Sequence, residues 1–275
     1  MGKAPVPVLL LILGAAHLRV AGAHSCTTDV YRGLTELYKQ AGGDTDWGEN
    51  WMKTDKDPCD GEWSNVNAEG DKIVKISFDD DKGDESGTLP SEIGLLTDLT
   101  EFSFKKMTDV SGTVPSEIGQ LAKLTKLKFE EVDLSGRLPS ELGCLTNLES
   151  ELKFKKTDIT GPIPSELGRL TKLMKLNFEG PNSISGSIPS ELGLLTLMKE
   201  FKAYKNSLTG SIPSELGRWT AASEIELYEN SLSGSIPSEL GRWTGLEKDD
   251  LKLYDNFLCG DLPSELSKLT SGKDG

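Results

Sequence analysis

The side chains that most often carry catalysis are scarce in this 275-residue sequence. Histidine occurs twice, as His17 and His24, both near the N-terminus. Because histidine is the commonest general base and metal ligand, a Ser–His or Cys–His nucleophile is excluded for the rest of the chain. No cysteines have the spacing of a zinc site, and each recurrent glycine belongs to a repeat rather than to a phosphate-binding loop. We therefore predict no enzymatic activity, no cofactor and no metal site.

Acidic residues suggest calcium binding at one place only. Residues 79–85 read Asp-Asp-Asp-Lys-Gly-Asp-Glu, but an EF-hand loop needs oxygen ligands at alternate positions and a closing glutamate, which this stretch lacks. A solvated loop is the better interpretation. The formal net charge of −14 disfavours nucleic acid and anionic membranes as partners.

Three tyrosines offer chemistry suited to binding. Tyr204, Tyr228 and Tyr254 recur at nearly constant spacing, and tyrosine combines a large apolar area with a hydroxyl, which favours it in interfaces. Charged residues lie two positions before each of them, and lysines hold the same place in earlier segments: Lys202, Glu226, Lys252, Lys128 and Lys153. These eight residues are the candidate partner-binding site. They form one site only if the secondary-structure elements that carry them place them side by side.

Those elements are internal repeats. The hexapeptide Leu-Pro-Ser-Glu-Ile-Gly at 89–94 returns with conservative changes starting at 114, 138, 163, 188, 212, 236 and 262. In the unit 216–237, Ile225 and Leu227 alternate with polar neighbours, as expected for a short strand. Asn230 follows at the turn, where its amide is able to bond to buried backbone. Stacked units of this kind share one continuous core.

The pattern resembles the plant-type leucine-rich repeat, whose units end in Leu-x-Gly-x-Ile-Pro, and the resemblance covers about residues 73–270. It implies an α/β solenoid: a right-handed superhelix of about eight repeats of 24–25 residues, with a concave parallel β-sheet that binds the partner. It also implies an N-terminal cap at 24–72, with Val30, Tyr31, Leu34, Leu37 and Tyr38 on one face of a short helix and Trp47, Trp51 and Trp63 over the first repeat. The cap and the solenoid, which covers residues 73–275, are expected to form one domain.

The first 23 residues are typical of a secretory signal peptide. Lys3 precedes an apolar run from Val8 to Ala16, and small residues end at Ala23. The run is shorter than the roughly 20 residues that a membrane span needs. We expect a secreted, extracellular or cell-wall protein, monomeric and without a membrane span.

Four cysteines remain after residue 23. The cap of this family usually pairs a cysteine such as Cys59 with one just after a Trp-x-x-Val segment, but Asn67 stands there, so the resemblance leaves Cys26 as the partner of Cys59. Cys144 and Cys259 lie four to five repeats apart, roughly 20 Å at the spacing of neighbouring strands, and a disulfide needs Cα atoms within about 7 Å. They are either unpaired thiols or form an intermolecular bridge.

The outward strand positions form columns that run along the solenoid. One column reads Lys75, Glu101, Lys126, Glu151, Lys175, Glu200, Glu224, Asp250, and another reads Asp79, Lys105, Glu130, Lys155, Glu179, Tyr204, Tyr228, Tyr254. Alternating charges on neighbouring strands stabilise a sheet, so the charged ladders are interpreted as structural. The tyrosines break the alternation, although stacking that only stabilises the sheet remains the alternative. Trp219 and Trp243 align with core leucines.

The sequence thus predicts a recognition protein that binds a protein, a peptide or a cell-wall polysaccharide on the concave face. The resemblance is to inhibitors of wall-degrading hydrolases (polygalacturonase-inhibitor-like proteins) and to receptor ectodomains. The alternative is a structural or surface-adsorbing protein, including an ice-binding one. The column after each repeat glycine reads Thr88, Thr113, Arg137, Pro162, Ser187, Ser211, Ser235, Asp261, which is a poor row of small hydroxyls.

Overall fold

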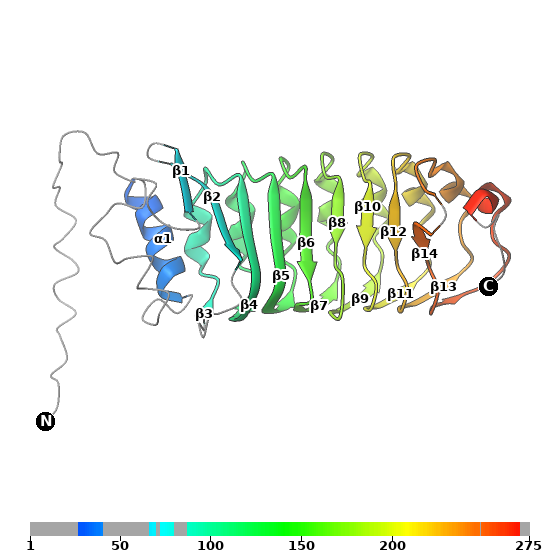
Figure 1. Ribbon diagram of the computed structural model, residues 1–275, viewed down its shortest axis with the longest axis horizontal. Coiled ribbons are helices and arrows are strands. Elements are labelled where there is room, and N and C mark those ends of the chain that lie inside the picture. Colours follow the sequence, from blue (N-terminus) through cyan, green and yellow to red (C-terminus); the bar gives the residue numbers. More distant parts are fainter. Residues whose placement is uncertain (1–26, 41–65, 70–71, 80–86, 248, 270–275) are drawn as a thin grey trace, which may run out of the picture.

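The computed structural model describes residues 27–40, 66–69, 72–79, 87–247 and 249–269. These residues form an elongated stack of repeats, with helix α1 (Thr28–Gln40) at one end and the last repeat at the other (Figure 1). Val30, Leu34 and Leu37 on one face of α1 are buried. The cap helix predicted from the sequence is therefore present and covers the first repeat through its contact with residues 91–95.

The strands fall into two groups along the stack. The first group, here called the first sheet, is parallel apart from β1; it comprises β1 (Val66–Glu69), β2 (Lys72–Asp79), the N-terminal parts of β4 (Glu101–Thr113) and β5 (Lys126–Arg137), β6 (Glu151–Lys155), β8 (Lys175–Asn177), β10 (Glu200–Lys202), β12 (Glu224–Glu226) and β14 (Leu251–Lys252). The second sheet comprises β3 (Gly87–Thr88), the C-terminal parts of β4 and β5, β7 (Asp158–Pro162), β9 (Ser183–Ser187), β11 (Ser207–Gly210), β13 (Ser231–Gly234) and β15 (Phe257–Leu258).

Short 3₁₀ helices line the remaining side of each repeat. They are η3 (Ser91–Leu95), η4 (Ser116–Gln120), η5 (Ser140–Cys144), η6 (Ser165–Arg169), η7 (Ser190–Leu194), η8 (Ser214–Arg218), η9 (Ser238–Arg242) and η10 (Ser264–Leu269). A proline comes directly before each one, since its fixed φ suits an entry where no backbone N–H is needed. A glycine in each helix from η3 to η9 lets the next helix approach: a Cβ on Gly143 would lie 2.4 Å from the carbonyl oxygen of Glu166.

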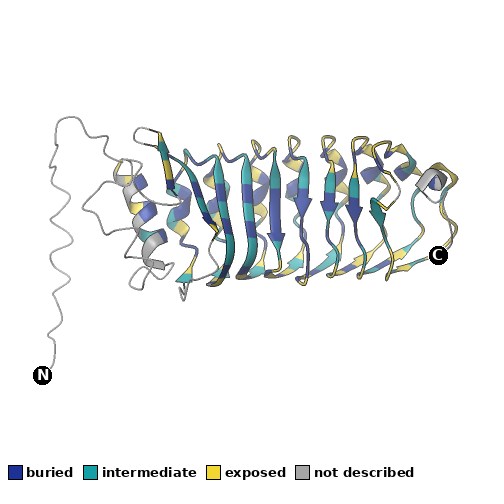
Figure 2. Cartoon of the chain, viewed as in Figure 1, coloured by how far each residue is buried: buried dark blue, intermediate teal, exposed yellow. Residues whose placement is uncertain are grey.

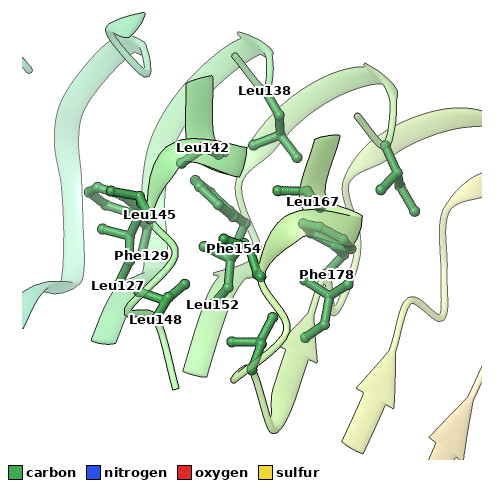
Figure 3. Packing of buried hydrophobic residues seen from close by; sticks show 14 of the residues in the cluster. Leu127, Phe129, Leu138, Leu142, Leu145, Leu148, Leu152, Phe154, Leu167 and Phe178 are labelled. Carbon is green, nitrogen blue, oxygen red and sulfur yellow. The ribbon is translucent and has the colours of Figure 1, made fainter. Parts of the chain in front are cut away.

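The core runs unbroken through all repeats. Buried residues line it in every repeat (Figure 2). Leucines and isoleucines from the strands, turns and 3₁₀ helices pack there, and the rings of Phe129, Phe154 and Phe178 follow one another along it (Figure 3). The ring centroids of Phe129 and Phe154 lie 5.4 Å apart, and those of Phe154 and Phe178 6.3 Å apart. Trp219 and Trp243 are fully buried, which confirms their predicted place in the core.

The turn asparagines bond as the sequence predicts. Asn230 Nδ2 donates to the carbonyl oxygens of Ala203 (2.9 Å) and Leu227 (3.0 Å), and Asn230 Oδ1 accepts from the N–H of Leu208 (3.1 Å). Asn182, Asn206 and Asn256 make equivalent bonds. The amides therefore tie successive repeats together where the backbone leaves the first sheet.

The early repeats, which lack this asparagine, solve the turn differently. Met107 and Val132 are buried and pair with each other inside β4 and β5, which continue from the first sheet into the second. The ladder shifts register between Met107 and Gly112. In these two repeats the pairing of Met107 with Val132 thus joins the strands at the corner, where an asparagine amide joins later repeats.

The residue before six of the seven turn positions adopts a left-handed backbone, and the exception is Pro181 before Asn182. Lys106, Glu131, Lys156, Lys205, Glu229 and Asp255 have φ between 50° and 56°. Left-handed φ is uncommon for residues other than glycine, and nothing in the sequence pattern marks these positions. The repeat glycines that follow, Gly112 to Gly260, have φ between 74° and 85°, as the tight backbone predicted for them requires.

Candidate functional site

The three tyrosines form one continuous stack on the outer face of the first sheet. The ring centroids of Tyr204 and Tyr228 are 4.5 Å apart with planes 7° from parallel, and those of Tyr228 and Tyr254 are 4.7 Å apart at 16°. The middle ring therefore has a tyrosine against each face. A partner would meet ring edges and hydroxyl groups here, together with Tyr254, which is 56% exposed. We call Tyr204, Tyr228 and Tyr254 the tyrosine column.

The Tyr204 hydroxyl links this column to the charged residues of the same sheet. Tyr204 Oη donates to Glu179 Oε2 at 3.0 Å. Glu179 also accepts from Asn177 Nδ2 at 2.8 Å and pairs with Lys155 Nζ at 2.8 Å. Because Glu179 is buried and has three partners, it fixes the first ring of the stack. The sequence placed Glu179 and Tyr204 next to each other in one column, but it did not predict the hydrogen bond between them.

The predicted register of the charged columns is confirmed. Lys75 pairs in register with Glu101, Glu101 with Lys126, and Lys126 with Glu151. Lys75 and Glu101 form a salt bridge of 2.9 Å, and Lys105 and Asp79 one of 3.0 Å. The alternation of sign therefore brings opposite charges together across strands, as expected for charges that stabilise the sheet.

The lysines and glutamate proposed beside the tyrosines are engaged in the same way. Glu130 pairs with Lys128 at 3.1 Å and with Lys153 at 3.2 Å. Glu226 pairs with Lys252 and lies 3.9 Å from Lys202, which in turn pairs with Glu224 at 2.7 Å. A charged ligand would have to compete with these pairs. These ion pairs, together with that of Lys155 and Glu179, lie on the same sheet as the tyrosine column, and we call them the lattice.

The lattice shifts the pKa of the groups inside it. Burial by itself raises the pKa of Glu130, but the hydrogen bonds and charges of Lys128 and Lys153 outweigh it and lower the pKa from 4.5 to about 2. Burial likewise raises the pKa of Glu179, and Lys155, Asn177 and Tyr204 reverse the effect, so that it too is lowered. Burial and then the Glu179 carboxylate raise the pKa of Tyr204. Both carboxylates are thus ionised, and the Tyr204 hydroxyl is neutral, at physiological pH.

Acid should weaken the fold through Glu130 in a defined window. Its folded pKa is lowered, so its stabilisation is complete above pH 4.5 and is lost as the pH falls toward about 2. Allowing for solvent screening, we expect about 1 kcal/mol, or about 2–4 °C in melting temperature. Melting curves of the native protein and Glu130→Gln should differ by this amount at neutral pH and converge near the bottom of the window.

The exposed pair of Lys205 and Glu229, 3.6 Å apart, supplies the control. Glu229→Gln should change the melting temperature little at neutral pH, because exposed ion pairs contribute little. A difference between native protein and Glu130→Gln that stays constant down to the lowest pH would contradict the assignment.

Several predicted features lie outside the described residues. These are the signal peptide, the tryptophans of the cap, Cys26 and Cys59, and residues 80–85 of the acidic stretch. Cys144 and Cys259 are described and are both free and exposed. In the described part of the chain, no group of three or more His, Cys, Asp and Glu side chains is placed to hold a metal ion. No helix within it is long and apolar enough to span a membrane.

Comparison with known proteins identifies the architecture. No protein-family model and no curated protein sequence matches the chain. Among solved structures, it is similar to the ectodomain of the plant receptor kinase GASSHO1/SCHENGEN3 from Arabidopsis thaliana, in complex with CASPARIAN STRIP INTEGRITY FACTOR 2. The identity is 27% and the TM-score 0.76, over 86% of this chain and 28% of that one. The fold is a leucine-rich-repeat solenoid.

Two further solved structures are similar to this chain. The plant peptide hormone receptor RGFR1, in complex with RGF2, is 27% identical with a TM-score of 0.60, over 75% of this chain and 35% of the receptor chain. A plant ice-binding protein is 23% identical with a TM-score of 0.62, over 87% and 90% of the two chains. This solenoid spans about a third or less of the two receptor ectodomains. At 23% identity, the second likeness shows the fold alone.

Proposed function

We propose that this solenoid is a secreted, non-enzymatic recognition protein that binds a peptide or an extended protein segment on the outer face of its first sheet. The observation that carries the proposal is the change of chemistry along one column of that face. From Asp79 to Glu179 the column alternates in charge, and from Tyr204 to Tyr254 it is aromatic. Similarity to two receptor ectodomains whose structures hold peptide partners supports a ligand of this class.

The charged part of the face is less suited to a ligand than the tyrosine column. Each carboxylate of the lattice already pairs with a lysine, and removing one partner from a buried pair is costly. The tyrosine column, in contrast, presents ring edges and the hydroxyl groups of Tyr228 and Tyr254 to a partner. Ordered tyrosines bind at low entropic cost, and their hydroxyls bond well to peptide backbone. The partner is therefore expected to lie across β10, β12 and β14.

Binding should depend on the rings of the tyrosine column. The substitutions Tyr204→Ala, Tyr228→Ala and Tyr254→Ala together remove three aromatic contacts, and interface tyrosines each contribute on the order of 1–2 kcal/mol or more. We expect loss of the partner retained from the extracellular medium by the immobilised native protein, identified by mass spectrometry. The Kd for that partner is then measured by calorimetry.

The matched control is the triple Tyr→Phe variant, which keeps the stack and removes only the hydroxyls. It should bind more weakly than the native protein but better than the triple alanine variant. Equal binding of native and triple alanine proteins, both with unchanged melting temperature, would contradict this site. The column would then serve only to stabilise the sheet.

A second candidate function is adsorption to an ordered surface such as ice. In β9, β11 and β13, the outward residues are all serine or threonine: Ser183, Ser185, Ser187, Ser207, Thr209, Ser231 and Ser233, with Ser211 and Ser235 directly after β11 and β13. The regular hydroxyls extend over three strands only, which favours the recognition function. An ice-recrystallisation assay with no effect at high protein concentration would exclude the candidate.

A further inference from the structure

A groove crosses four repeats on the side of the solenoid where the second sheet turns into the 3₁₀ helices. Its volume is about 1350 Å³, and it is lined by successive turns with the sequence Ser/Pro-Ile-Pro-Ser-Glu, at 162–166, 187–191 and 211–215, and by Ser235 and Pro237. It lies away from the tyrosine column, which occupies the other sheet. The groove is a distinct feature that the proposed function does not use.

Each repeat contributes the same three surfaces to the groove. The lining includes Ser187, Ser211 and Ser235, all exposed, and half-exposed prolines such as Pro189 and Pro213. It also includes the carboxylates of the third surface, Glu166, Glu191 and Glu215. Along each turn a ligand meets a hydroxyl, a proline C–H surface and a carboxylate acceptor, in the order of the sequence.

The carboxylates are oriented by their own repeats. Ser190 Oγ donates to Glu191 Oε2 at 3.4 Å, and the serines before Glu166 and Glu215 do the same at 3.5 Å. Within the described part of the chain, no lysine or arginine forms a salt bridge with these three glutamates. Their second oxygens are available to accept hydrogen bonds from a ligand.

At one end of the groove the residue after the repeat glycine changes from small to bulky. In the preceding repeat this residue is Arg137, whose side chain lies directly against Gly161, and the lining begins at the next repeat with Pro162. The same position therefore accepts a bulky arginine without loss of the fold. A single arginine at Ser187, Ser211 or Ser235 would place such a side chain in the groove.

We propose that this groove binds a linear, uncharged polysaccharide along the solenoid axis. Each sugar of such a chain presents hydroxyl donors to the carboxylates and C–H faces to the prolines. Because the sugars are identical, these groups recur along the chain, as the lining residues recur in each repeat. An anionic glycan is disfavoured by the row of glutamates. A basic peptide fits less well, because the serines and prolines of the lining are neutral. In addition, Arg169, Arg218 and Arg242 each lie three residues after a glutamate of the same 3₁₀ helix, and positions i and i+3 align on such a helix.

The test is a calorimetric titration of the full chain with cellohexaose and laminarihexaose as probes. We expect binding of one of them, with an affinity that rises from the disaccharide to the hexasaccharide. Ser211→Arg, which reproduces Arg137 inside the groove, should weaken binding at least tenfold. Ser207→Arg, which adds the same side chain to β11 outside the groove lining, should leave binding unchanged.

Three further variants separate the competing explanations. Ser235→Arg replaces Ser211→Arg in this test if the Ser211→Arg protein does not melt cooperatively, and it should weaken glucan binding by the same factor. Glu191→Gln, whose amide still accepts a hydrogen bond, should change glucan affinity less than threefold, and hexagalacturonate should not bind. The triple tyrosine-to-alanine variant should bind glucan like the native protein, so failure of the proposed function leaves this inference intact.

The inference is overturned if neither hexasaccharide binds at millimolar concentration, or if Ser211→Arg and Ser207→Arg bind alike. Loss of glucan binding in the triple tyrosine variant alone would move the glycan to the first sheet and also overturn it. Binding of polylysine that Glu191→Gln abolishes, without glucan binding, would assign the groove to a basic partner instead.

Discussion

Replacing Trp219 with alanine will lower the free energy of unfolding by about 3–5 kcal/mol, the range for large aromatic side chains removed from a packed core. The indole is fully buried. Its ring lies 5.4 Å from that of Phe201 and 6.3 Å from that of Trp243, centroid to centroid. Its Nε1 donates to the carbonyl oxygen of Leu192 at 2.9 Å, so the substitution also removes one of the two donors to that carbonyl, which keeps the N–H of Leu195. Urea unfolding followed by circular dichroism measures the loss.

Two milder substitutions divide this effect into its parts. Trp219→Phe keeps an aromatic ring and removes the Leu192 hydrogen bond, at an expected cost of about 1–3 kcal/mol. Trp219→Leu introduces the residue found at the equivalent Leu170 and Leu195 of earlier repeats, and should fall between phenylalanine and alanine. A phenylalanine variant as unstable as the alanine variant would show that the hydrogen bond, rather than the packed volume, dominates.

The second large effect concerns the turn position of the repeat, where Asn230→Val and Val132→Asn should both destabilise the protein. Asn230→Val leaves the N–H of Leu208 without its acceptor and removes one of two amide donors from the carbonyls of Ala203 and Leu227, which keep Asn206 and Asn256. The unpaired N–H costs about 1–3 kcal/mol and each of the two lost bonds about 0.5–1.5 kcal/mol, so we expect a loss of about 3 kcal/mol. Urea unfolding at neutral pH measures it.

The reverse substitution restores the repeat consensus and is nonetheless expected to fail. Val132 is fully buried and pairs with Met107 within continuous strands. An amide there takes the place of a fully buried apolar side chain, and burying it costs roughly 1–3 kcal/mol. A stabilising Val132→Asn would contradict this account and would show that the early turns are defective copies of the later ones. Asn206→Val, in an equivalent turn, serves as the positive control.

The two substitutions illustrate where the sequence pattern is sufficient. The period of the repeat determined the fold, because each unit has an apolar side that only a neighbouring unit covers. Strand alternation then determined which residues face outward, since a shift by one residue would turn every core side chain to solvent. The columns from Lys75 and Asp79, the buried tryptophans and the asparagine amides followed from these two rules.

Features that depend on distance within the structure did not follow from the sequence. The columns placed Tyr204 near Tyr228, but only the structure shows that the rings stack face to face and that Glu179 holds the first of them. It alone shows that Lys128 and Lys153 share Glu130, which turns candidate ligand contacts into parts of a lattice. Rotamers decide these contacts, and a repeat pattern fixes only the backbone position from which each side chain starts.

The sequence by itself therefore determined the solenoid, its core and the order of chemistry along its faces, because these depend on periodicity and hydrophobic burial. The tertiary structure decided three further features. These are the continuous strands β4 and β5, the left-handed corners from Lys106 to Asp255, and the groove beside Ser187, Ser211 and Ser235. Each arises from how neighbouring repeats meet in space, as where the side chain of Arg137 lies against Gly161 of the next repeat.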